Sequence, residues 1–383
     1  MTTVFQHARK LDAHGEVDDF WMLVDGDTIT ATGSGEAPPA DTIVDVDGQW
    51  LVPGFIDLHC HGGGGFAFDD GADAISRALA VHRAHGTTRS VISLVANPLA
   101  LLRESLEVIT EVAAHDPLVL GAHLEGPFLE LGHRGAHNGN YLREPQPSAV
   151  DDLLNAAHGS LRQLTIAPDL PNALESIEIL VEAGVTVAVG HTAATFEQTE
   201  AAFAAGARLL THAFNAMPGI HHRAPGPVVA AFNDDRVFIE LVLDGLHVHP
   251  DIAALAFASA PGRIALVTDA MAAAGSSDGD YQLGSLAVTV AGGKAVLRGT
   301  DTIAGSTLTL DRALRIAISA VGLSPREAVE AVTLTPARAL GLEARLGLLA
   351  PGFAADAVLL DHAWGVTGVW GAGSRIPVPS PAS

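Results

Sequence analysis

The sequence is poor in cysteine, in lysine and in basic charge generally. Cys60 is the one cysteine among 383 residues, so no disulfide can form within the chain and a reducing compartment is expected. Only 21 basic residues stand against 44 acidic ones, and two of the basic residues are lysines, Lys10 and Lys294. The resulting net charge of −23 disfavours binding to the phosphates of nucleic acids.

Long apolar runs are also missing. No stretch approaches the roughly 18 uninterrupted apolar residues that a membrane span requires. The first 19 residues mix charges with scattered apolar residues and have no apolar core of a signal peptide. We therefore expect a cytoplasmic protein that binds neither membrane nor nucleic acid. Hydrophobic residues make up 48% of the chain, which is enough for a large buried core.

Short runs rich in Val, Ile and Leu alternate with alanine-rich segments of helical character. Such alternation is typical of repeated β–α units around a parallel sheet, and eight units close a TIM-type barrel. We therefore predict an α/β fold, a (β/α)8 barrel over residues 53–346. The eight candidate strands lie at residues 51–59, 88–94, 117–125, 163–167, 185–191, 208–212, 237–244 and 264–269.

The two ends of the chain show a different pattern. Residues 18–50 and 352–370 hold short alternating segments, punctuated in the first by Asp-Gly turn signals. We predict that residues 1–52 and 347–383 form one small β domain packed on the barrel, with a disordered tail at 377–383.

An insertion is predicted after the eighth strand. Residues 281–298 contain two strand-like runs around Gly292-Gly293, which is typical of a hairpin. Ser306 or Thr307 is a candidate N-cap for the helix that follows.

Metal-binding residue types recur at the predicted strand ends. His59 and His61 lie two apart in an extended segment, so both imidazoles face the same side. All strands of a parallel barrel end at one rim, so such residues converge there. Imidazole and carboxylate groups are ligands for a divalent metal ion that activates water. The candidate ligands at the strand ends are His59, His61, Glu125, His191, His212 and Asp269, and Asp269 can also move protons as an acid/base.

The motifs around these residues resemble a known family, the N-acetylglucosamine-6-phosphate deacetylases of the amidohydrolase superfamily. The resemblance extends over almost the whole chain. THAFNAM, DGLHV and HLEGPF are its specific parts, whereas the His-x-His pair is shared across the superfamily. It runs through PGFIDLHCHGGGG (53–65), HLEGPFL (123–129), GAHN (135–138), GHTAAT (190–195), THAFNAMPG (211–219), DGLHVHP (244–250), VTDAM (267–271) and IAGSTLTL (303–310).

The resemblance implies a role for each matching position. It implies that Glu125, His191 and His212 are the principal metal ligands, that Asp269 is the catalytic acid/base and that His137 polarises the substrate carbonyl. It further implies one or two divalent ions per subunit, zinc first and iron or another ion as alternatives. Some family members replace the first histidine pair and use one ion, whereas here the pair is intact. Implied substrate contacts are Ala136, His137, Asn215, Ala216, Arg223, His247, Ile303, Ala304 and Gly305, with Arg223 reaching the neighbouring site of a homodimer.

The expected reaction is hydrolytic deacetylation of N-acetylglucosamine 6-phosphate, and three alternatives stay open. Another amidohydrolase, such as a dihydroorotase, hydantoinase or dipeptidase, is disfavoured because no lysine for a carboxylated metal bridge lies between His61 and His191. A deacetylase of the galacto epimer shares the same metal set. A non-enzymatic sensor of metal or sugar phosphate is disfavoured by the intact Asp269. The loop at residues 129–136 is a candidate lid.

Overall fold

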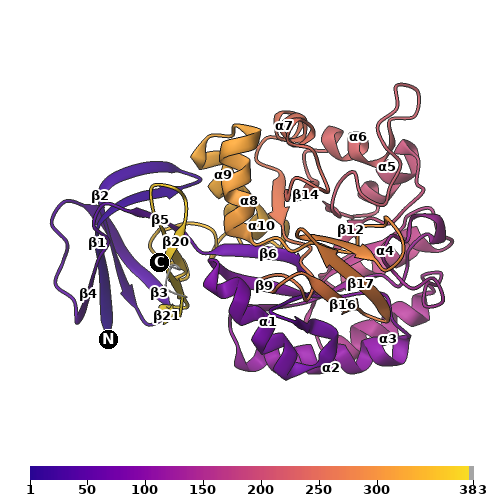
Figure 1. Ribbon diagram of the computed structural model, residues 1–383, viewed down its shortest axis with the longest axis horizontal. Coiled ribbons are helices and arrows are strands. Elements are labelled where there is room, and N and C mark those ends of the chain that lie inside the picture. The colour runs from indigo at the N-terminus through magenta and orange to yellow at the C-terminus, as the bar shows by residue number, and fades with distance from the viewer. Residues whose placement is uncertain (379–383) are drawn as a thin grey trace.

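The computed structural model of the chain describes residues 1–378, so most of the tail predicted to be disordered lies outside the described residues. Figure 1 shows a barrel surrounded by helices on the right and a smaller β domain on the left, where the N-terminus also lies. The predicted fold class, a TIM-type barrel with a β domain built from both termini, is confirmed. The boundaries after residues 52 and 346 stay predictions.

Eight parallel strands form the barrel, and neighbours in the sheet follow the order of the chain. Closure between the last strand and the first is made by Asp269 N–H, which donates to His59 O at 2.8 Å, and by His61 N–H, which donates to Ala270 O at 2.8 Å. The two strands are therefore joined beside the candidate ligands. The strands are β6 (Phe55–Cys60), β9 (Thr87–Leu94), β10 (Val119–Glu125), β11 (Leu161–Ile166), β12 (Thr186–Val189), β13 (Leu209–Leu210), β14 (Phe238–Val242) and β15 (Ile264–Val267).

A helix follows each barrel strand, as the alternating pattern predicts. Local signals explain where several helices begin: Pro147 starts one, and Thr195 with Gln198 forms a capping box at the start of another. The helices are α1 (Ala72–Ala84), α2 (Leu99–His115), α3 (Pro147–Ala157), α4 (Ala173–Glu182), α5 (Phe196–Ala204), α6 (Gly226–Asn233), α7 (Pro250–Ser259) and α8 (Leu310–Ile316), followed by α9 (Pro325–Val332) and α10 (Leu334–Ala339).

The predicted N-cap of α8 is wrong. The helix begins at Leu310 with Thr309 as the preceding residue, and neither Ser306 nor Thr307 caps it. Both hydroxyls have tertiary partners instead: Ser306 donates to Thr268 O at 2.6 Å, and Thr307 donates to Gly293 O at 2.8 Å. The segment is therefore held against the end of β15 and the insertion, and the helix starts one turn later.

The small β domain contains more strand than the sequence pattern indicated. The prediction placed its strands from residue 18 onward, but β1 begins at Thr2. The sheet order is β21-β20-β19-β5-β1-β2-β3, with β4 paired to β1, so the C-terminal strands pair with β5 of the N-terminal segment. The strands are β1 (Thr2–Asp12), β2 (Gly15–Asp25), β3 (Thr28–Ser34), β4 (Thr42–Asp45), β5 (Trp50–Pro53), β19 (Ala357–Leu360), β20 (Val366–Gly371) and β21 (Ser374–Ile376).

The insertion after β15 is a three-stranded antiparallel sheet. The predicted hairpin is present as β17 (Leu286–Ala291) and β18 (Lys294–Leu297), which turn at Gly292-Gly293 with φ of +59° and +74°. An additional strand, β16 (Gly279–Leu283), pairs with β17. Leu283 from this sheet reaches the cavity described below, so the insertion forms part of its wall.

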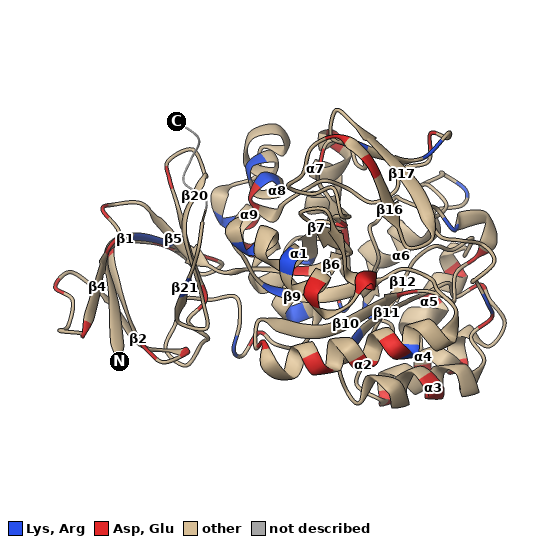
Figure 2. Cartoon of the chain, turned by 60° about the horizontal axis from the view of Figure 1, so that its bottom comes forward, with Lys and Arg blue, Asp and Glu red and all other residues tan. Residues whose placement is uncertain are grey.

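Acidic residues are spread over the outside of the barrel. Figure 2 shows them in red on helices such as α2 and α3, with basic residues fewer and scattered. Among residues 1–378, no helix combines the length and apolar character needed to cross a membrane.

Candidate active site

The candidate ligands meet at the carboxyl ends of the barrel strands. Glu125 is the last residue of β10, and His59 lies within β6. His191, His212 and Asp269 each come two residues after a strand, and their φ values are +47°, +24° and +47°. This left-handed conformation costs a non-glycine residue roughly 1–3 kcal/mol. The backbone therefore turns sharply at each strand end, and the three side chains enter the barrel mouth.

Glu125, His191 and His212 form one compact group. Glu125 Oε1 lies 3.0 Å from His191 Nε2 and 2.9 Å from His212 Nε2, and the two nitrogens are 3.0 Å apart. Ligand atoms that share a tetrahedral ion are separated by roughly 3.3 Å. The three side chains are each 5% exposed, so water competes little for their lone pairs. The group fits a divalent metal ion.

His59, His61 and Asp269 form a second group next to the first. The Nε2 atoms of the two histidines are 3.0 Å apart, and Asp269 Oδ1 lies 3.7 and 3.5 Å from them. Glu125 faces this group as well, with Oε1 3.4 Å from His59 Nε2 and Oε2 3.2 Å from His61 Nε2. The structure thus brings all six predicted ligands together, with Glu125 between the two groups.

Hydrogen bonds on the far side of two rings determine which nitrogen is free. His191 Nδ1 lies 2.9 Å from the carbonyl oxygen of His133, and His59 Nδ1 lies 3.0 Å from Glu240 Oε2. Both partners can only accept, so Nδ1 carries the hydrogen in each ring and Nε2 of the neutral ring presents a lone pair. These are the tautomers that a metal site needs.

The protonation states of Glu125 and His191 favour a cation, whereas His59 must first lose a proton. Burial alone would raise the pKa of Glu125, but the nearby His59 and His137 hold it well below its usual range. Burial lowers the pKa of His191 to about 4. Burial opposes charge on His59 as well, yet Glu125, Asp269 and Glu240 raise its pKa well above the usual value. Metal binding would therefore displace a proton from His59.

A cavity of about 530 Å³ opens above the two groups. It is lined by most of the predicted substrate contacts, and Arg134, at the exposed rim, also lines it. Ala304 does not line the cavity: it is fully buried in an apolar cluster, whereas its neighbours Ile303 and Gly305 do line the cavity. The predicted contacts that do line it are Ala136, His137, Asn215, Ala216, His247, Ile303 and Gly305.

His137 is oriented as a hydrogen-bond donor. Its Nδ1 accepts the backbone N–H of Ala96 at 3.1 Å, which places the hydrogen of the neutral ring on Nε2. That nitrogen lies 3.2 Å from Glu125 Oε2, beside the metal groups and on the cavity wall. The geometry therefore suits a group that polarises a carbonyl bound at this point.

His247 is held by Asp244. The two side chains meet at 2.8 Å between Nδ1 and Oδ2, and both are 7% exposed. Burial would raise the pKa of Asp244, but the hydrogen bonds and charge of His247, together with the backbone N–H of Leu246, lower it. The ionised carboxylate orients the imidazole, which lines the cavity.

The chain matches known proteins over nearly its full length. Residues 50–375 match the amidohydrolase family. N-acetylglucosamine-6-phosphate deacetylase from Bos taurus is 37% identical over 88% of this chain and 86% of its own length. N-acetylgalactosamine-6-phosphate deacetylase from Escherichia coli O157:H7 is 38% identical over 97% and 98%. A solved N-acetyl-D-glucosamine-6-phosphate deacetylase from Mycobacterium smegmatis, a variant in complex with N-acetyl-D-glucosamine-6-phosphate, has 42% identity, a TM-score of 0.93 and 99% coverage of both chains.

This chain belongs to the N-acetylglucosamine-6-phosphate deacetylase family of amidohydrolases. It is therefore a hydrolase of a metal-dependent family, as the motifs predicted.

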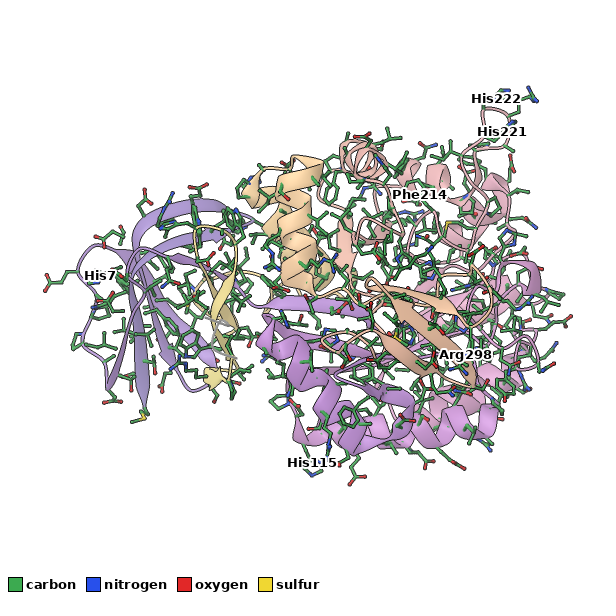
Figure 3. The ribbon with its side chains drawn as sticks, viewed as in Figure 1. His7, His115, Phe214, His221, His222 and Arg298 are labelled. Atoms are coloured by element: carbon green, nitrogen blue, oxygen red, sulfur yellow. The ribbon has the colours of Figure 1, made fainter. Side chains whose placement is uncertain are left out.

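Arg223 is another predicted site residue of this deacetylase-family chain that does not line the cavity. It belongs to the segment between β13 and α6, and its Nη1 lies 2.6 Å from His222 Nε2. Figure 3 shows His221 and His222 at the tip of a loop that projects from the barrel. The structure does not bring Arg223 to the cavity of its own subunit, so its contact with a neighbouring site stays a prediction.

Sequence reasoning overlooked several residues around the site of this amidohydrolase. Glu240 and Gln163 lie beneath the ligands, and His133 contributes the carbonyl that orients His191. Glu240 did leave a signal, since it is the one charged residue in the apolar run at 237–243. The backbone carbonyl of His133 left none, because a loop conformation decides where it points.

Proposed function

We propose that this protein hydrolyses N-acetylglucosamine 6-phosphate to glucosamine 6-phosphate and acetate. The proposal depends mainly on one observation: Glu125 lies between two metal-ligand groups and next to the donor nitrogen of His137. This arrangement suits attack of water on an amide carbonyl. Two relatives named for this activity, from Bos taurus and Mycobacterium smegmatis, are 37% and 42% identical to the chain.

Glu125, His191 and His212 would hold one divalent ion, and His59, His61 and Asp269 a second. A bound divalent ion supplies Lewis acidity and brings the pKa of water toward neutrality. We propose zinc, since nitrogen and oxygen ligands in this arrangement suit it, with iron as the alternative.

Two side chains would assist the reaction, one by transferring a proton and the other by stabilising the developing negative charge. Asp269 would accept the proton from the attacking water and later deliver it to the leaving amine nitrogen. His137 Nε2–H would donate to the carbonyl oxygen and stabilise the negative charge that develops there. Both groups line the same cavity, so one bound acetamide can meet both.

Phosphate recognition requires positive or donor groups on a protein of strongly acidic composition. His247 lines the cavity without belonging to either metal group, and Asn215 and Ala216 line the cavity as well. We propose a homodimer in which Arg223 of the partner subunit joins them, because a guanidinium binds phosphate in a bidentate manner. The projecting position of the loop next to His222 supports this arrangement. A cytoplasmic location is consistent with the single, buried Cys60.

The galacto epimer is the second candidate substrate. The relative from Escherichia coli O157:H7 that is named for it is 38% identical over 97% of the chain. The metal groups act on the acetamide, so they do not distinguish the two sugars. We place the gluco substrate first because several relatives of 33% to 42% identity carry that name.

Acetate release by purified, metal-analysed protein tests the proposal. The substrates are N-acetylglucosamine 6-phosphate, its galacto epimer and unphosphorylated N-acetylglucosamine, each with a chelated control. Preferential, chelator-sensitive turnover of the gluco phosphate is expected. Faster turnover of the galacto phosphate would select the second candidate. If metal-loaded protein leaves every acetamido sugar intact, the deacetylase assignment fails.

A further inference from the structure

Glu240 is a buried carboxylate beneath the metal ligands, and the proposed reaction gives it no role. It lies on β14 and is 0% exposed. Oε2 lies 3.0 Å from His59 Nδ1 and 3.3 Å from the backbone nitrogen of His212, and Oε1 accepts Gln163 Nε2–H at 2.7 Å. Glu240 therefore contacts one residue from each ligand group and is itself held from behind.

The contact with His59 determines how that ring can act. With Nδ1 donating to a carboxylate, Nε2 of the neutral ring keeps its lone pair directed at His61 and Glu125. A carboxylate partner also makes the imidazole a stronger ligand than a neutral partner does. By contrast, Nδ1 of His61 and of His212 has no hydrogen-bond partner among the described residues. Of the two histidines in the second group, His59 is thus the one whose Nδ1 is hydrogen-bonded to a carboxylate.

The negative charge of Glu240 affects how many divalent ions the buried cluster can hold. Glu125, Asp269 and Glu240 place three carboxylates within one buried cluster, where uncompensated charge is costly. One divalent ion with neutral imidazoles would leave a net charge of −1, whereas two ions would leave +1 before any substrate or water-derived anion binds. A site with two ions can therefore accept an anion, and a site with one ion already has an excess of negative charge.

We propose that Glu240, held by Gln163, is a positioning residue: its hydrogen bond to Nδ1 of His59 keeps Nε2 free to bind metal, so that the group of His59, His61 and Asp269 can hold a second ion. This inference depends on the metal-dependent function proposed above but not on its substrate. A metal titration tests it without any turnover, so failure of the deacetylase assignment would leave its result intact.

The experiment compares zinc binding by wild-type protein and by Glu240→Leu, which keeps a similar volume and removes the acceptor. Equilibrium dialysis against zinc buffers, followed by elemental analysis, is expected to give two ions in the wild type. In the variant the second ion should bind about 10–100-fold more weakly, while the first is unchanged. Gln163→Leu should weaken the same ion to a smaller extent, because Glu240 then keeps its contact with His59.

His123→Leu is the matched control. His123 is also buried, and its ring lies 4.7 Å from that of His59, but its nitrogens bond only the hydroxyls of Ser93 and Thr165. This variant should keep both ions. If Glu240→Leu does not fold, Glu240→Gln keeps an acceptor oxygen, and an intermediate loss of the second ion is expected.

Several outcomes would overturn the proposal. They are a wild type that binds one ion, a folded Glu240→Leu protein that holds both ions normally or loses both in parallel, and an equal loss in the His123→Leu control.

Discussion

Replacing Arg89 by methionine tests how the small β domain is attached to the barrel. Arg89 lies near the start of β9, at the end of the barrel away from the metal groups. Its Nε lies 2.6 Å from Asp356 Oδ2 and its Nη2 3.2 Å from Oδ1, just ahead of β19. The two side chains are 11% and 7% exposed, so this bidentate pair is nearly shielded from solvent.

The expected loss of stability follows from that burial. Removing one partner of a buried ion pair leaves the other charge without compensation and costs about 3–5 kcal/mol. Arg89 also donates to the carbonyl oxygen of Pro117, which loses this partner. An unfolding entropy of about 2.1 cal/mol/K per residue gives roughly 0.8 kcal/mol/K for a chain of this length. The predicted fall in Tm is therefore about 4–6 °C.

Thermal and urea unfolding monitored by circular dichroism would measure the change. The double variant Arg89→Met/Asp356→Asn should recover part of the loss, because it removes the stranded charge and keeps an acceptor for Ala372 N–H, now 2.7 Å from Asp356. Arg298→Met is the exposed control: its side chain is 55% exposed, so a change within about 0.5 kcal/mol is expected. The reasoning is refuted if Arg89→Met shifts Tm no more than this control, or if the double variant is less stable than the single one. Activity at 25 °C should stay unchanged.

Four further predictions concern the site and the pH range of stability. Asp269→Asn should lower kcat by about 10²–10⁴-fold while the ion of Glu125, His191 and His212 is retained, as acetate release and elemental analysis would show; normal turnover in this variant would contradict the acid/base role. Arg134 is a cationic side chain on the cavity lining and so a further candidate to bind the phosphate. Arg134→Ala should therefore raise KM for the phosphorylated substrate about tenfold, or about 1.4 kcal/mol, and leave KM for the unphosphorylated sugar unaffected, whereas equal effects on both would exclude a phosphate contact. Removing the ions with a chelator should lower Tm, and zinc should restore it; an unchanged Tm would mean that the ions do not stabilise the fold. Burial would raise the pKa of Asp311, but His85 and Arg315 lower it to about 2. The ionised carboxylate therefore adds roughly 2 kcal/mol to the free energy of unfolding above the unfolded pKa, and this contribution is lost as pH falls through about 2. Asp311→Asn should accordingly unfold more easily than the wild type at pH 7 but not near pH 2.

Much of the barrel and its mouth was predictable from local pattern. Apolar runs of strand length alternating with helical segments indicate β–α units, and parallel strands must end at one rim. The positions of Glu125, His191 and His212 at strand ends were therefore enough to expect them together, although they are far apart in the chain. The structure places their ligand atoms 2.9–3.0 Å apart.

The sequence by itself thus determined the fold class and the chemical type of the site, because strand period and strand-end position are local properties. Tertiary structure decided what depends on distant partners. Ser306 has the hydroxyl of an N-cap but bonds the carbonyl of Thr268 instead. Glu240 acquires its role only because β14 lies where its carboxylate reaches both His59 and Gln163. Such contacts join residues of different strands, and no local pattern encodes which atoms will meet.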